Sequence, residues 1–439
     1  MTLLISSVRN RDNAMKNVSL GYLSALSSGY VLMGANLLIQ FALTPFYLDY
    51  LGEQSFGMLM MLLNLINFAA IGITWMSGGL VRVMGESWAR SDFTNFRNVF
   101  AVGKYVFTLY AILAVSLGYF IWFIWGDDGS DESVSAAVIL AGIYLVLNYE
   151  ALTERQAFVG SNKQDIGNYI ELSRVLFFAG LTYFLLPKLQ NMTAVWISLM
   201  SGVLLQRVIT GLYWRKCLGN TGWKRFTPVM KPILERLAGK QGAGYVGYGA
   251  LLLLLQADTM IMGFIGGAEV AGQFVLLWKI PEAIGLLLWR IPSTIEPKVI
   301  HLDASGQHEA LRSIFTRGRR WYFLLLLTAS LVYMIVGQWL ATLWVGEHAP
   351  VESWMYIASG VALFFNSFAR WPISFSYALI KLSPLIKIAL VEVVSKIVLI
   401  IILFPYTGIA SPIVALIITH ACYVAWAYQK TMSYGVRTI

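Results

Sequence analysis

The chain is dominated by long apolar runs separated by short polar segments. A run of about 20 apolar residues is long enough to cross the hydrocarbon core of a bilayer as a helix. The pattern predicts twelve such helices, at residues 19–46, 56–80, 100–125, 134–152, 166–187, 193–214, 242–265, 268–292, 321–346, 353–378, 383–404 and 409–430. We therefore expect an all-α polytopic membrane protein, with no loop long enough to fold as a separate soluble domain.

Polar residues inside the first two runs recur at helical spacing. Asn36, Gln40 and Thr44 are four residues apart, and Asn64 and Asn67 are three apart. Each set therefore lies on one face of its helix. In lipid such a face must meet protein or water, because an unsatisfied polar group there costs several kcal/mol. Two interpretations remain open: hydrogen bonds that tie neighbouring helices together, or the polar wall of a cavity formed by Asn36, Gln40, Asn64 and Asn67.

The charges between the runs predict an orientation. If the N-terminus is cytosolic, Lys188 is the only Lys or Arg in an outer loop, and acidic residues such as Asp127, Asp128 and Asp131 are concentrated there. This distribution follows the positive-inside rule and predicts that both termini are cytosolic. The formal net charge of +9 is thus explained by membrane orientation and gives no reason to expect a nucleic-acid partner.

The amino-acid composition supports assignment to the class of integral membrane proteins. The 439 residues are 58% hydrophobic and 13% charged, with a mean hydropathy of +0.66. A soluble domain carries about 25% charged residues, so a soluble protein is excluded. The short loops also argue against a membrane-embedded glycosyltransferase or polymerase, which we expect to carry a sizeable outer loop with catalytic acids.

The chain shows signs of an internal duplication. Residues 52–104 align with residues 267–319 at an offset of 215 positions without a gap, with seven identities. The identical positions are Gly52/Gly267, Gly57/Gly272, Leu62/Leu277, Ala89/Ala304, Arg97/Arg312, Phe100/Phe315 and Gly103/Gly318. They cluster at a helix start and in a polar loop. With six helices in each half, the two halves have the same orientation in the membrane and are related by an axis along the membrane normal.

A basic, aromatic-rich segment lies where the two halves would join. Residues 215–241 contain seven Lys and Arg together with Trp223 and Phe226, and prolines at 228 and 232. Such a segment is typical of an interfacial linker on the anionic inner leaflet. We therefore predict an N-terminal lobe at 1–214, a basic cytosolic linker at 215–241, and a C-terminal lobe at 242–439.

Several charges lie inside the predicted spans, where each costs at least about 2.5–3.5 kcal/mol on the insertion scale. Some have a charge of opposite sign within one helical turn, a spacing that allows each pair to neutralise itself. These pairs are Glu171/Arg174, Lys279/Glu282 and Glu392/Lys396. Arg207, Arg290 and Glu150 lie near the cytosolic ends, where long side chains can reach the interface.

Two charges have no partner nearby in the sequence. Asp258 lies in the span 242–265, and Arg370 lies in the span 353–378 with Asn366 and Ser374 on the same face. We expect them to pair across helices or to contact a ligand or coupling ion.

The charge types suggest a cargo. Lys279, Arg370, Arg174, Lys396 and Arg290 are predicted to form a cationic cavity suited to an anionic, phosphate-bearing substrate. The carboxylates of Asp258, Glu282 and Glu392 are predicted to couple transport to a proton or Na⁺ gradient. No cofactor is expected.

The cysteines and histidines carry no clear chemistry. Cys217 and Cys422 are isolated and indicate neither a disulfide framework nor a metal motif. His301 and His308 share a loop without neighbouring acids or cysteines, so solvated loop histidines are expected rather than a metal site.

Two stretches resemble a known family. TPFYLDYLGEQSFGMLMMLLNLINF, with the following GGLVRVMGE, looks like the opening of Wzx-type polysaccharide flippases, which belong to the multidrug/oligosaccharidyl-lipid/polysaccharide exporter superfamily. QADTMIMGFIGGAEVAGQFVLLWKIPEAIG is similar to the second opening of that family, and Asp258 matches its helix-7 acid. The sequence departs from the family at TWMSGG, where an acidic or Asn-Gly step is common, and the first helix lacks the buried acid of many multidrug exporters.

The resemblance implies a MATE-like fold of two six-helix lobes in the bacterial inner (cytoplasmic) membrane. It further implies a flippase, not an enzyme, that moves undecaprenyl-diphosphate-linked oligosaccharide, such as an O-antigen or capsule repeat unit, by ion-coupled alternating access. Its partners would be this lipid-linked glycan, membrane lipids and other membrane proteins of polysaccharide assembly. The alternative is an ion-coupled multidrug exporter of the same fold, whose usual cationic cargo fits a Lys- and Arg-rich cavity less well.

Overall fold

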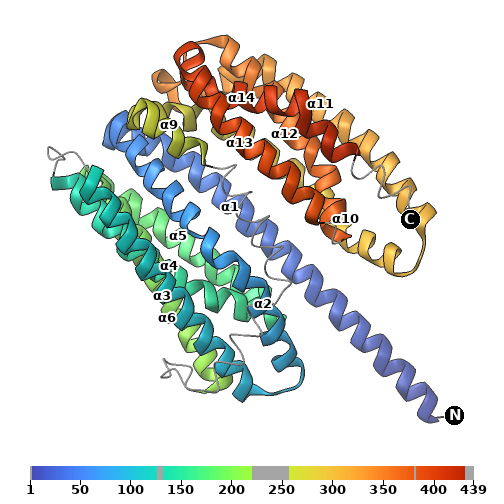
Figure 1. The fold of residues 1–439 in the computed structure, drawn as a ribbon. Helices are drawn as coiled ribbons and strands as arrows, with labels where there is room; N and C mark the ends of the chain where they lie inside the picture. Colours follow the sequence, from blue (N-terminus) through green and yellow to red (C-terminus); the bar gives the residue numbers. More distant parts are fainter. Residues whose placement is uncertain (1, 126–131, 220–256, 380–381, 431–439) are drawn as a thin grey trace. The chain divides into compact units, whose positions relative to one another are not determined.

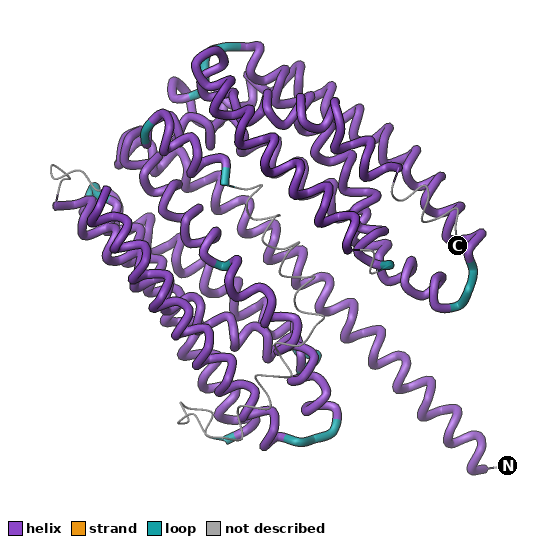
Figure 2. Tube along the Cα trace, in the orientation of Figure 1, coloured by secondary structure: helices purple, strands orange, loops and turns teal. Residues whose placement is uncertain are grey.

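The structure, a computed structural model, describes residues 2–125, 132–219, 257–379 and 382–430 (Figure 1). Throughout these residues the chain is helical, with short turns and no strand (Figure 2). This confirms the predicted all-α class. Most of the predicted linker 215–241, and the predicted span 242–265 up to Gln256, lie outside the described residues.

The chain divides into two compact units. The first unit is residues 1–46 and 72–242, and the second is residues 47–71 and 243–439. Residues 47–71, near the end of helix α1, thus belong with the C-terminal half of the chain. The lobe boundaries at 214 and 242 stay a prediction, because the segment that would join the lobes lies largely outside the described residues.

In the first unit, α3 to α6 pack on one another. The helices of this half of the chain are α1 (Thr2–Ala69), α2 (Ile71–Ala89), α3 (Phe93–Trp125), α4 (Glu132–Gly160), α5 (Gln164–Leu189) and α6 (Met192–Leu218). An aromatic cluster of Trp88, Phe96, Phe158 and Trp214 joins α2, α3, α4 and α6, with ring centroids 5.0–6.1 Å apart. This cluster fixes the helix ends near the α4–α5 turn.

The second unit repeats this order of helices. Its helices are α9 (Asp258–Gly266), α10 (Ala268–Ala304), α11 (His308–Val345), α12 (Ser353–Ala378), α13 (Leu382–Thr407) and α14 (Ser411–Thr419), with short 3₁₀ turns at Gly346–His348 and Gly408–Ala410 and a π-helix, η3, at His420–Val424. The starts of α11, α12, α13 and α14 follow those of α3, α4, α5 and α6 by 215, 221, 218 and 219 positions. The offset found in the sequence therefore recurs in the helices.

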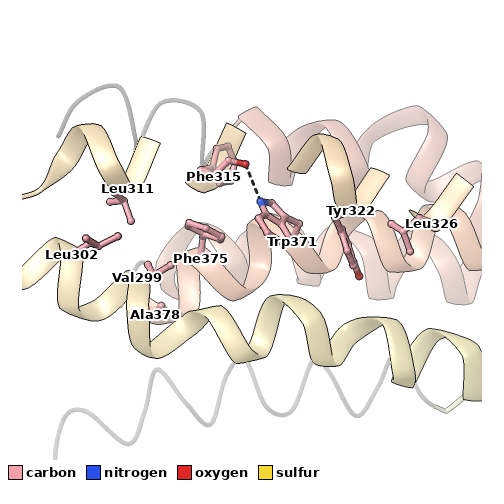
Figure 3. Close-up of a cluster of buried hydrophobic side chains, with 9 residues drawn as sticks. All are labelled: Val299, Leu302, Leu311, Phe315, Tyr322, Leu326, Trp371, Phe375 and Ala378. Atoms are coloured by element: carbon pink, nitrogen blue, oxygen red, sulfur yellow. Dashed lines mark hydrogen bonds between the residues drawn. The ribbon is translucent and has the colours of Figure 1, made fainter. Parts of the chain in front are cut away.

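The core of the second unit includes an aromatic cluster between α10, α11 and α12 (Figure 3). Trp371 is fully buried and donates a hydrogen bond from Nε1 to the Phe315 carbonyl oxygen at 3.2 Å. Gly318 faces the Trp371 ring, and a Cβ atom there would lie 2.4 Å from it. Residues of α11 and α12 thus approach closely because a glycine leaves room for the indole.

Two pairs of duplicated glycines have matching structural roles. Gly52 breaks α1 with φ 75° and ψ 168°, and Gly267 separates α9 from α10 with φ 89° and ψ 173°. Such positive φ values favour glycine. Five residues after each break, Gly57 and Gly272 pack directly against one another. This symmetric contact supports the duplication more strongly than the seven identities do.

Substitution at Gly57 tests that contact. A Cβ atom at Gly57 would lie 1.7 Å from the Ala268 carbonyl oxygen, so Gly57→Ala must push the segment 53–69 away from α10. We expect about 1–3 kcal/mol of destabilisation, as for overpacked cores, measured as a lower thermal unfolding midpoint in detergent. The control is Gly34→Ala in the same helix, where a Cβ meets nothing within 4 Å. Equal effects of the two changes would contradict the close contact.

Seven helical segments among the described residues are long and apolar enough to cross a membrane. They are Ser24–Ala69, Phe93–Phe120, Ser135–Gly160, Gln164–Leu189, Met192–Leu218, His308–His348 and Pro384–Lys430. The first and last contain 46 and 47 residues, about twice the length that one crossing needs. The chain is thus a multi-pass membrane protein, while the count of twelve spans and the cytosolic termini stay predictions.

Candidate functional site

The second unit contains a cavity of about 290 Å³. Its wall is built by residues of the last part of α1 (residues 47–69), of α9, α10, α12, α13 and α14, and of the stretch that follows α14. The polar and aromatic lining residues are Asn64, Asn67, Asp258, Trp278, Lys279, Glu282, Trp289, Asn366, Arg370, Glu392, Lys396, His420 and Tyr428. Residues as far apart in the sequence as Met60 and Tyr428 therefore meet at one site within the second unit.

A buried pair of opposite charges in the cavity wall joins Lys396 on α13 to Asp258 at the start of α9. Lys396 Nζ lies 2.7 Å from Asp258 Oδ2, and the two side chains are 5% and 14% exposed. The expectation that Asp258 pairs with another helix is therefore met. Two opposite charges this close stabilise each other strongly where water is largely absent.

Glu392, one turn before Lys396, contacts a different helix. Glu392 Oε1 lies 2.8 Å from Nε2 of His420, and both residues are buried. The sequence predicted a Glu392/Lys396 pair along α13; instead, each side chain reaches across to another element. The physical reason is that both project from one face of α13, where α9 and η3 offer partners.

The predicted pair on α10 is present. Lys279 Nζ lies 3.3 Å from Glu282 Oε2, with the Glu282 side chain 47% exposed. A pair this exposed contributes little to the stability of a protein in water. Its relevance to the site is that both side chains line the cavity.

Arg370 differs from the other bases of the cavity. Its guanidinium carbon lies 4.6 Å from the centroid of the Trp289 ring, a cation–π distance. Among the ion pairs of the described residues, none involves Arg370. A charged group held by an aromatic face retains free donors for an anion.

The structure does not assemble all five predicted bases at this cavity. Lys279, Arg370 and Lys396 line it, whereas Arg290 is exposed on α10 and Arg174 belongs to the first unit. Three carboxylates, those of Asp258, Glu282 and Glu392, line the same space. The cavity therefore balances three bases with three acids, and Arg370 is the base with no ion pair among the described residues.

The predicted polar wall also divides between the units. Asn64 and Asn67 line the cavity, and Asn64 also donates to the Met60 carbonyl oxygen at 3.1 Å. Asn36 and Gln40 belong to the first unit, where Asn36 donates to the Leu32 carbonyl oxygen at 2.9 Å. Asn36 and Asn64 thus each satisfy one donor within their own helix.

The first unit holds a separate network of buried charges. Glu150 and Glu154 on α4 both contact Lys104 of α3, at 3.5 and 2.9 Å, and Glu150 contacts Arg207 of α6 at 2.6 Å. The sequence predicted that Arg207 extends to the interface; it turns inward because Glu150 offers a buried carboxylate. Lys104 lies well inside α3, which begins at Phe93.

The predicted Glu171/Arg174 pair lies in the same unit with a further partner. Glu171 Oε1 accepts a hydrogen bond from Arg155 Nη2 at 3.0 Å and contacts Arg174 closely. One carboxylate thus joins two guanidinium groups and ties α4 to α5.

Glu150 is the residue to test in this network. Glu150→Gln leaves Arg207 without its carboxylate, and removing one partner of a buried pair costs about 3–5 kcal/mol. We expect a clear fall in the thermal unfolding midpoint in detergent. The control is Glu86→Gln, whose partner Arg82 is 70% exposed, because exposed pairs contribute little. A Glu150→Gln protein as stable as wild type would show that the network does not hold α3, α4 and α6 together.

Sequence reasoning missed several of these residues. His420 is a histidine inside an apolar run, and an ionisable residue at such a place is a functional candidate by default. Trp289 carried no signal, because a tryptophan in a membrane helix is ordinary. In the part of the chain that the structure describes, no three His, Cys, Asp or Glu side chains gather as a metal site requires.

Comparison with known proteins gives the fold. No family model and no curated protein matches the sequence. Among solved structures, an inward-facing multidrug resistance MATE family transporter of the MOP superfamily aligns with TM-score 0.65 and 13% identity, covering 94% of this chain and 99% of that one. A Vibrio cholerae MATE transporter aligns with TM-score 0.59 and 14% identity over 95% and 98% of the two chains. A eukaryotic MATE transporter aligns with TM-score 0.58 and 12% identity over 94% and 93%. The chain therefore has the fold of the MATE transporters, along nearly its whole length.

Proposed function

We propose that the protein is a flippase that moves undecaprenyl-diphosphate-linked oligosaccharide across the bacterial inner membrane by alternating access. Two things support the transport class: the multi-pass helical architecture and the likeness to MATE transporters over 94% of the chain. The solved structures it resembles are transporters rather than enzymes.

The observation that carries the choice of cargo is Arg370. This side chain lies in the cavity wall against Trp289 with no carboxylate partner among the described residues. A guanidinium offers several donors in a fixed plane, a geometry that suits phosphate oxygens. The tryptophans and amides around it (Trp278, Trp289, Asn64, Asn67 and Asn366) offer ring faces and hydrogen bonds to a sugar.

An ion-coupled multidrug exporter is the second candidate. Asp258, Glu282 and Glu392 line the same cavity, and carboxylates attract the cationic compounds that such exporters carry. The multidrug resistance transporter with which the chain aligns is consistent with this alternative. Against it, Asp258 and Glu392 are engaged by Lys396 and His420, which leaves Glu282 as the most accessible acid.

Deleting the gene separates the candidates. The flippase proposal predicts intact lipid-linked repeat units that accumulate on the cytosolic leaflet. Unchanged surface glycan with new drug sensitivity would favour the exporter. Missing or chemically altered repeat units would indicate an enzyme.

A further inference from the structure

His420 combines three features in the wall of the cavity. It opens the π-helix η3 (His420–Val424), it is 2% exposed, and it is held by Glu392. Single π-turns inside α-helices occur frequently at functional sites. The π-turn contains one residue more than an α-helical turn. It therefore sets the direction in which the side chains that follow α14 project.

The hydrogen bonding of His420 is incomplete. Nε2 lies 2.8 Å from Glu392 Oε1. With an ionised carboxylate there, Nε2 carries the hydrogen and donates it, so Nδ1 of the neutral ring is an acceptor. Nδ1 is buried and makes no hydrogen bond with any described residue. Nδ1 is therefore the ring nitrogen at which a proton can be added.

The charges around His420 are balanced, so one added proton changes the net charge of the cavity. The titratable and charged groups that line the cavity with it are Asp258, Lys279, Glu282, Arg370, Glu392, Lys396 and Tyr428. Three acids and three bases cancel when His420 is neutral. A proton on His420 would leave the cavity with a net charge of +1, and the Glu392 carboxylate would hold the imidazolium in place.

We propose that the cavity takes up a proton at His420 together with an anionic group of the phosphate or sulfate class. The anion supplies the negative charge that balances the protonated ring, and the proton supplies the net positive charge that the anion requires. The two ligands then strengthen each other's binding by the same factor, as thermodynamic linkage demands. The inference deepens the proposed function and rests on its anion-binding cavity.

The sign of this linkage constrains the transport cycle. A proton and an anion that bind together favour the same side of the membrane, so an inward proton gradient does not by itself drive export of an anionic cargo. Export would then draw on the supply of cargo or on a second ion.

The test uses the purified full-length chain in detergent and inorganic sulfate, whose charge is constant over the pH range needed. Binding is measured by titration calorimetry at about pH 5.5 and about pH 7.5, within the range where a histidine side chain can change its charge. Each titration is repeated in two buffers of different ionisation enthalpy to count protons. We expect sulfate to bind about tenfold more tightly at the lower pH, within the 5–150-fold range of coupled sites, with up to one proton taken up.

His420→Gln should remove both the pH dependence and the proton uptake, and Glu392→Gln should weaken both. The control is His348→Gln, because His348 Nδ1 also lies 2.8 Å from a carboxylate, that of Glu53, but outside the cavity lining. It should behave as wild type. If His420→Gln does not fold, Glu392→Gln alone decides the test.

Sulfate binding independent of pH, proton uptake that persists in the variant, or no sulfate binding at either pH would overturn the inference. The flippase proposal would survive each of these results, because its test is the position of the lipid-linked glycan. Conversely, proton-linked sulfate binding in a protein whose deletion leaves the glycan unchanged would uphold the site and reject the cargo.

Discussion

Replacing Lys396 by methionine is expected to destabilise the second unit strongly. The variant leaves the Asp258 carboxylate, 14% exposed, without its partner at 2.7 Å. Removing one member of a buried pair costs about 3–5 kcal/mol. At about 2–4 °C per kcal/mol for a unit of this size, the thermal midpoint in detergent should fall by about 6–20 °C.

Two further variants separate charge from packing. Asp258→Asn combined with Lys396→Met removes both charges and should recover much of the lost stability, because a neutral pair needs no counter-charge. Lys387→Met on the same helix, where the side chain is exposed, should leave the midpoint unchanged. A Lys396→Met protein with a wild-type midpoint, or a double variant less stable than the single, would contradict the role of the pair.

Replacing Arg370 by glutamine is expected to reduce glycan export with little loss of stability. The side chain has no ion pair among the described residues to leave unsatisfied. If the guanidinium binds a phosphate, the loss of a charged hydrogen bond of about 1.5–3 kcal/mol corresponds to about 10–150-fold weaker cargo binding. Export is measured as the rate at which repeat units appear at the cell surface.

Lys279→Ala should also reduce export, because Lys279 lines the same cavity. Arg370→Lys should recover only part of the loss, because lysine keeps the charge without the planar donors or the stacking on Trp289. Lys298→Gln, an exposed position on α10, is the matched control. Wild-type export in both Lys279→Ala and Arg370→Gln, with normal membrane insertion, would reject the cavity as the cargo site.

The sequence predicted the fold well because its main signals are local. Apolar runs and their periodicity indicate helices directly, and the match of Gly52 with Gly267 marked a backbone conformation that both halves share. The offset of 215 positions was recoverable because the breaks between helices demand glycine at equivalent places. Span counts are harder, since the apolar segment Ser24–Ala69 is interrupted only by the break at Gly52.

The site was predicted only in part, because pairing between helices is not encoded in spacing. A distant partner for Asp258 could be expected, but 138 positions separate it from Lys396, and no periodicity could select that lysine. The i, i+4 spacing of Glu392 and Lys396 suggested a local pair, which packing against α9 and η3 replaced. Lys104 lies in the predicted span 100–125, but its position in the sequence could not indicate Glu150 and Glu154 of another helix as its partners.

The charge balance of the cavity is the finding that most changes the functional picture. Five bases without neighbouring acids would give the cavity a large positive charge that attracts any anion. The structure instead leaves Arg370 as the base without a carboxylate partner among the described residues and places His420 where a proton alters the net charge. Under the proposed function, recognition of an anionic cargo would depend on Arg370, Trp289 and a proton on His420.

The most direct test of the proposed function is transport by the purified protein. The protein is reconstituted into liposomes that carry undecaprenyl-diphosphate-linked oligosaccharide, and a membrane-impermeant glycosidase reports the fraction of glycan on the outer leaflet. The proposal predicts that the wild-type protein makes the inner-leaflet glycan accessible over time, and that Arg370→Gln does so much more slowly. Equal accessibility in protein-free and protein-containing liposomes would contradict it.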